Sequence, residues 1–265
     1  MNIFWHELRA NRKSTIIWSV SLILLAILYL SFYPAFAKDA EQFTKIMEGY
    51  PEAVRIALGV NNADFYSILG FYCFPLAFIT LCGAIQAMNL GTSIVSREVR
   101  EKTADFLLTK PVTRSAVITA KLLAALASIV ITNIAYLLAA ILTAEQVKTA
   151  DFSIKIFLLL SLTLLFIQLI FLSIGFIVSV MFQKIRSVLT VSLATVFAFY
   201  FLGMLSDTSG ESAKRFISPF KYFDTAYIMK HAGFEGEFLL AGGIIFLLAV
   251  ALSYFIYRKK DIHTL

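Results

Sequence analysis

The chain has 265 residues, of which 59% are hydrophobic and only 15% are charged. Its mean hydropathy is +0.81. Roughly a quarter of the residues in a soluble domain are charged, so this composition excludes a soluble protein. The apolar residues form long uncharged runs and do not alternate as the strands of a membrane barrel do. We therefore expect an all-α integral membrane protein.

Crossing a bilayer takes about 20 apolar residues in a helix. Six stretches without Asp, Glu, Lys or Arg are long enough, and they predict transmembrane helices at residues 14–37, 65–96, 122–144, 156–183, 187–206 and 238–257. Each should be helical, because backbone amides in lipid must bond within their own segment. The remaining segments are too divided for a second core, so residues 1–265 are predicted to form a single transmembrane domain.

Basic residues gather on one side of this topology. The termini and the second and fourth loops hold fourteen basic and five acidic residues, whereas the other three loops hold nine basic and twelve acidic residues. Lys and Arg are retained on the cytoplasmic side during insertion, so both termini are predicted to be cytoplasmic. The formal net charge of +6 then reflects topology and contact with anionic membrane lipids, and no nucleic-acid partner is expected.

The N-terminal segment, residues 1–13, is predicted to be an interfacial amphipathic helix. Phe4, Trp5 and Leu8 share one face, while Arg9 and Lys13 lie opposite. An apolar face with Trp and Phe under a basic face is typical of a helix that lies on anionic lipid. The alternative is a positive flank that only fixes the topology.

Two outer loops carry patterns of their own. Residues 38–64 predict two short amphipathic helices, and residues 207–237 predict a partly re-entrant cap or a headgroup segment, with a soluble loop as the alternative. The aromatic side chains of the second loop are Phe216, Phe220, Tyr222, Phe223, Tyr227 and Phe234.

The loop between the second and third spans differs in kind. After a charged helix-forming segment from Ser96, it places Phe106, Leu107 and Leu108 in succession, and Pro111 then interrupts the helix. The pattern predicts a cytoplasmic elbow of two helical arms. Three large apolar side chains exposed to cytoplasmic water are unfavourable unless something buries them, and a protein partner is the natural candidate. The alternative is that they fold back onto the membrane surface.

This loop carries a family resemblance. The string TADFLLTKPVTR, from Thr103 to Arg114, followed by Lys121, resembles the signature of ATP-binding-cassette (ABC) permeases of the type-2 export class. Two positions depart from it: Lys102 stands where a Gly commonly precedes the Thr, and Asp105 replaces the commoner Glu. The strings SPFKYFD at 218–224 and RKKDI at 258–262 extend the resemblance to the bacitracin-resistance and nitrous-oxide-reductase-maturation permeases.

The resemblance implies that the elbow is a coupling helix seated on a separate ABC ATPase subunit. Its docking residues would be Arg100, Thr103, Asp105, Phe106, Leu107, Leu108, Pro111, Thr113 and Arg114. The chain has no G-x-x-x-x-G-K-[ST] phosphate loop, so it is not expected to be an enzyme, and ATP and Mg²⁺ would be bound by the partner. Further implications are export, two ATPase copies, a second permease copy or a paralogue, and a bacterial or archaeal plasma membrane.

Few polar side chains lie inside the predicted spans. Cys82, Gln86, Asn89 and Ser93 follow one face of the second span, and the other amides are Asn133 and Gln168. The candidates for a substrate pathway or a dimer seam are Gln86, Asn89, Ser93, Asn133 and Gln168. The alternative is that they hydrogen-bond between helices. The predicted spans contain no charged residue or His, which argues against proton coupling. A secondary transporter or channel without an ATPase is the alternative function.

Overall fold

The computed structural model describes residues 3–38, 49–51, 54, 67–101, 113–182, 185–208 and 212–259. Its long helices are α1 (Ile3–Ser31), α4 (Ile68–Glu101), α6 (Arg114–Val147), α7 (Ile154–Met181), α8 (Val188–Thr208) and α10 (Gly236–Lys259). Short helices η1 (Ser212–Ile217), η2 (Pro219–Lys221) and α9 (Thr225–His231) lie between α8 and α10. Within these ranges there is no β-strand.

All six predicted spans are present as helices long and apolar enough to cross a membrane. The all-α, six-span prediction is confirmed. The largest difference in a boundary outside the N-terminal segment is at the third span, which begins at Arg114 and not at position 122. The helix extends because Lys121 is not a loop residue: it is buried against neighbouring helices. Most of the first outer loop, with its two predicted helices, lies outside the described residues.

The N-terminal segment is helical, but it is not a separate element. Residues from Ile3 onward continue directly into the first span as one helix, so a distinct interfacial helix ending near Lys13 is not observed. Trp5 is 56% exposed and its ring contacts Phe4 edge to face at 5.6 Å between centroids. Phe4 and Leu8 are only partly exposed. Attachment of this turn to lipid stays a prediction.

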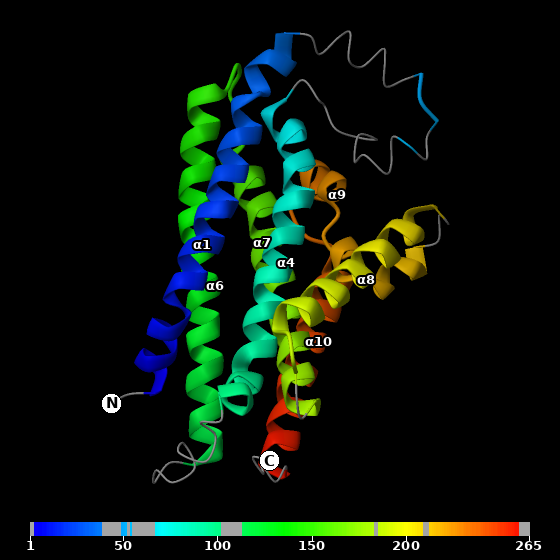
Figure 1. The fold of residues 1–265 in the computed structure, drawn as a ribbon. Coiled ribbons are helices and arrows are strands. Elements are labelled where there is room, and N and C mark those ends of the chain that lie inside the picture. The colour runs from blue at the N-terminus through cyan, green and yellow to red at the C-terminus, as the bar shows by residue number, and fades with distance from the viewer. Residues whose placement is uncertain are drawn as a thin grey trace.

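The helices are arranged around a central pair, α4 and α7, with α1 and α6 packed together on one flank (Figure 1). On the other flank α10 packs against α7, and α8 runs obliquely past α4. The start of α1, the end of α4, the start of α6 and the end of α10 lie at one end of the bundle, which we call the coupling end. The predicted cytoplasmic location of this end stays a prediction.

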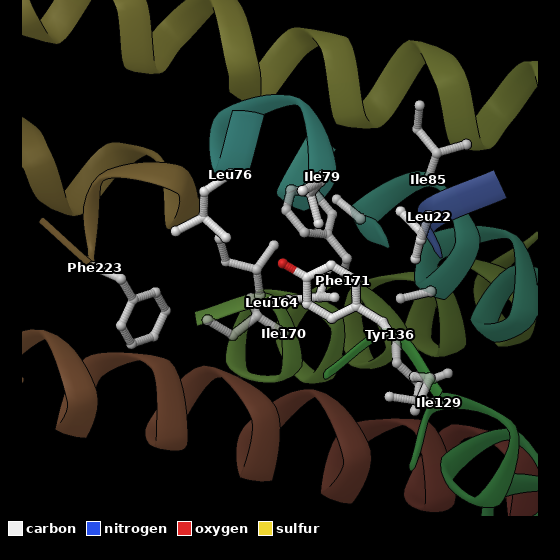
Figure 2. Packing of buried hydrophobic residues seen from close by; sticks show 14 of the residues in the cluster. Leu22, Leu76, Ile79, Ile85, Ile129, Tyr136, Leu164, Ile170, Phe171 and Phe223 are labelled. Atoms are coloured by element: carbon white, nitrogen blue, oxygen red, sulfur yellow. The ribbon is translucent and has the colours of Figure 1, made fainter. Parts of the chain in front are cut away.

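The central pair makes backbone-to-backbone contact. A methyl carbon added at Gly91 of α4 would lie 2.3 Å from the carbonyl oxygen of Leu172, and one added at Gly175 of α7 would lie 2.6 Å from that of Met88. Small residues are what allow such an approach in lipid, where van der Waals packing holds helices together. Farther from the coupling end, side chains of α4, including Leu76 and Ile79, pack with those of α7 (Figure 2).

The connection from α8 to α10 folds back against α7 and α8, and its re-entry into the membrane stays a prediction. Phe220 of η2 contacts Phe171, which lies beyond the middle of α7, at 5.1 Å between ring centroids. The Ser218 hydroxyl donates to the carbonyl of Phe199 within α8. Arg215 then fixes the segment by pairing with Glu235 at 2.7 Å and lying 4.2 Å from the ring centre of Phe238.

We expect Gly91→Ala to destabilise the helix bundle by about 1–3 kcal/mol, since the added carbon meets backbone that cannot rotate away. The matched control is Gly243→Ala, because nothing lies within 4 Å of a carbon added there. Reversible unfolding of the purified protein in mixed micelles measures both. Equal stability of the two variants would contradict the close crossing.

Candidate functional site

The predicted docking residues fall mostly outside the described structure. Residues 102–112 are not described, so the contacts of the Phe106–Leu108 patch stay predictions. Arg100 lies in the last turn of α4. Thr113 is the N-cap of α6, where its side chain accepts a hydrogen bond from the backbone amide of Ala116, and Arg114 is the first residue of that helix. Both arms of the elbow are therefore anchored on long helices.

Three of the four amides in the predicted polar set, all except Asn89, belong to one hydrogen-bonded network in the bundle. The Gln168 amide donates to Gln86 at 3.0 Å, and Asn133 donates to Gln168 at 2.5 Å. Gln86 in turn donates to the hydroxyl of Thr132 at 2.9 Å, which also accepts from Ser19 at 3.0 Å. We call these five residues the central network.

The central network joins four helices. Its members come from α1, α4, α6 and α7. Gln86 is 1% exposed, and Thr132 and Gln168 are fully buried. An unbonded amide would be costly in such an apolar interior, so these mutual bonds favour a structural role for Gln86 and Gln168. Sequence reasoning found the amides but missed Ser19 and Thr132, because hydroxyl residues are common in membrane helices and neither stands out.

The rest of the polar stripe on α4 has a different environment. Asn89 and Ser93 are half-buried. Ser93 bonds to the carbonyl of Leu90 within its own helix. No group in the described parts of the chain hydrogen-bonds the Asn89 side chain. The stripe is therefore divided: Gln86 turns into the bundle, whereas the half-buried Asn89 amide bonds to no group within the described parts of the chain.

A buried ion pair marks the coupling end. Lys121 of α6 is 4% exposed and lies 3.3 Å from the carboxylate of Glu7 in α1. Its ammonium group also donates to the backbone carbonyl of Ile94 in α4 at 2.9 Å. Because the predicted spans are stretches without charged residues, the sequence prediction assigns Lys121 to the second loop. Its apolar neighbours in sequence, Leu122 and Leu123, are the signal that could have placed it in the helix.

At the opposite end, a second buried cluster fixes the same helices. The hydroxyl of Tyr72 in α4 is hydrogen-bonded to that of Tyr136 in α6 and, at 2.9 Å, to that of Ser161 in α7. Both tyrosines are buried. Among the described residues, no group of three His, Cys, Asp or Glu side chains could hold a metal ion. These geometries are those of a packed helix bundle in which buried polar side chains on different helices bond to one another.

Comparison with known families decides the class. The chain matches the ABC-2 family transporter protein over residues 1–262, which is nearly its whole length. The chain belongs to the ABC-2 transporter family. A search among curated proteins finds no match. Membership makes the chain a permease component of an ABC transporter, as the resemblance in the second loop implies, and it leaves the branch within the family open.

For an ABC-2 permease, the central network is a test of how the helices are held. We expect Gln168→Leu to lower the free energy of unfolding in micelles by about 1–3 kcal/mol, since it removes two interhelical bonds. The control is Thr143→Val, which removes only a bond to Ala139 within α6. A Gln168→Leu variant as stable as this control would contradict the network.

Proposed function

We propose that this ABC-2 permease is the transmembrane subunit of an ATP-driven exporter in the cell membrane, and that it docks a separate ATPase subunit through its second loop. The observation that carries the proposal is the family match over residues 1–262. It coincides with a loop that presents Phe106, Leu107 and Leu108 in succession.

The lengths of α4 and α6 support docking over a return of the loop to the membrane surface. Each helix has 34 residues. At 1.5 Å per residue each is about 51 Å long, against a hydrocarbon core of about 30 Å. The apolar span of α4 ends at Ser96, and its helix continues to Glu101. Such helices can carry the intervening segment clear of the lipid and toward a soluble partner.

In this proposal ATP and Mg²⁺ bind to the partner, because this sequence lacks a phosphate loop. Two permease subunits and two ATPase subunits form the transporter. Closure of the ATPases on ATP moves the docked segments, and the spans shift between inward-open and outward-open arrangements. The permease itself supplies the pathway and no chemistry.

The exposed part of the polar stripe is the best candidate for that pathway or for the seam with the second permease. Phe78, Cys82, Asn89 and Ser93 lie within about 60° of one another around α4, at 100° per residue. Phe78 is 40% exposed, and the other three are half-buried. An amide without a bond on a lipid-facing surface is unfavourable, so Asn89 favours a polar occupant or a second copy at this face.

The competing function is a secondary transporter or channel. It requires ionisable groups deep in the membrane. Within the described spans, the buried charge is that of Lys121, and it lies near one end of α6 against the carboxylate of Glu7. This position suits a fixed structural tie more than an ion pathway. The charge distribution therefore supports the ABC permease.

The docking proposal predicts that Leu107→Asp or Leu108→Asp abolishes pull-down of the ATPase subunit at unchanged membrane insertion. A carboxylate in a desolvated groove should cost several kcal/mol. Arg100→Ala, on the charged flank of the patch, should weaken binding less, because binding energy concentrates in apolar centres. Full retention of the partner by both Asp variants would rule out this loop as the docking site.

The division of the stripe yields a separate prediction. Asn89→Leu should leave the free energy of unfolding within about 0.5 kcal/mol of the unchanged protein, since no bond is lost, yet lower the ATP hydrolysis of the complex in liposomes. Gln86→Leu should instead lower stability, because it breaks the central network. If the two variants lost the same stability, Asn89 would be structural as well.

A further inference from the structure

Lys121 joins three helices beside the predicted docking loop. It belongs to the third turn of α6, and its ammonium group reaches Glu7 of α1 at 3.3 Å and the carbonyl of Ile94 in α4 at 2.9 Å. We call this arrangement the Lys121 tie. Ile94 lies two turns before α4 ends at Glu101, and α6 begins at Arg114. The tie therefore links α4 and α6, the two helices between which residues 102–112 lie in the sequence.

The burial of the tie indicates that it holds the helices in a fixed geometry. Lys121 is 4% exposed and Glu7 is 13% exposed. Removing an ammonium group from water is costly unless a charge and further hydrogen bonds compensate for it. Here a carboxylate and a backbone carbonyl from two other helices provide that compensation. Displacing α4 or α1 relative to α6 would therefore break a charged contact in an apolar setting.

Glu7 connects the tie to the rest of the bundle through α1. The same helix carries Ser19, which bonds to Thr132 of the central network. On the neighbouring turn of α6, Thr119 bonds to the hydroxyl of Tyr254 in α10 at 2.8 Å. The first turns of α6 thus contact α1, α4 and α10 through polar bonds. A movement of the docking loop has a direct physical route to the N-terminal helix.

We propose that Lys121 is a positioning residue that transmits displacement of the docking loop to α1, so that ATP binding by the partner changes the environment of the N-terminal turns. The inference rests on the proposed function, because it needs an ATPase at residues 102–112. Lys121 and Glu7 are not among the predicted docking residues. Loss of the Lys121 tie should therefore uncouple the two subunits without separating them.

Four variants test the tie in the intact complex. Lys121→Met removes the bonds to Glu7 and to Ile94, and Glu7→Gln removes the Glu7 charge while leaving the bond to Ile94. Lys121→Arg keeps a positive donor and should preserve function. Lys148→Met is the matched control, because Lys148 lies at the other end of the same helix and pairs only with exposed carboxylates there, those of Glu145 and Asp151, among the described residues.

The first readouts are ATPase retention in a pull-down and ATP hydrolysis by the complex in liposomes. Lys121→Met and Glu7→Gln should retain the ATPase and lower the permease-dependent hydrolysis about tenfold, which corresponds to the coupling expected for contacting charged groups. Lys121→Arg and Lys148→Met should leave both quantities unchanged. Because Glu7→Gln is the milder change, it remains informative if Lys121→Met fails to fold.

The second readout separates transmission from simple stability. With Cys73 and Cys82 changed to Ala, a reporter Arg9→Cys on the exposed face of α1 is labelled with a fluorescent maleimide, with and without Mg²⁺, ATP and vanadate. Nucleotide should change the labelling rate in the otherwise unchanged complex and in Lys148→Met, but not in Lys121→Met or Glu7→Gln.

The outcomes distinguish the two proposals. A nucleotide response that persists in Lys121→Met and Glu7→Gln overturns the role of the tie and leaves the proposed function standing. Loss of ATPase retention by these two variants would instead make Lys121 part of the docking surface, and it too overturns transmission. If the unchanged permease retains no ATPase, the proposed function fails and this inference fails with it.

Discussion

The close crossing of α4 and α7 at Gly91 and Gly175 is the contact on which the rest of the bundle depends. In lipid, the hydrophobic effect does not draw one apolar helix to another, so association relies on packing and hydrogen bonds. Two helices whose backbones touch gain that packing over a long seam. The paired α4 and α7 then form a central support, with α1 and α6 on one flank and α8 and α10 on the other.

Polar bonds fix the α1 and α6 flank to this support at three depths. Tyr136 bonds to Tyr72 near one end, Thr132 accepts from Gln86 in the middle, and Lys121 donates to Ile94 at the coupling end. Each of these bonds runs from α6 to α4. Apolar contacts tolerate sliding along a helix, whereas donor and acceptor pairs fix the register. Their distribution explains how α6, which packs mainly on α1, holds a defined position against α4.

The spans could be predicted from the sequence because membrane crossing is a property of each segment by itself. Uncharged length is sufficient to find α4 or α7. Partners are a property of pairs of segments, so the sequence could not say that Gln86 bonds to Gln168, or that Lys121 continues a helix because Glu7 lies beside it. The prediction of a separate N-terminal helix was wrong for a related reason: the amphipathic pattern of residues 1–13 does not indicate where that helix ends. Residues 102–112, with the strongest sequence signal, lie outside what the structure describes.

Backbone contact between helices and side-chain hydrogen bonds resist a change of shape in different ways. Backbone contact at Gly91 leaves no side chain that could rotate to absorb a displacement, so α4 and α7 should move as a unit. The α1–α6 flank meets this pair through a few buried polar bonds, such as that from Gln86 to Thr132, and leaving such a group without a partner is costly. A shift at the boundary between the central pair and the α1–α6 flank would therefore have to break these bonds. The Lys121 tie crosses this boundary at the coupling end, where a displacement of the docking loop would first be felt.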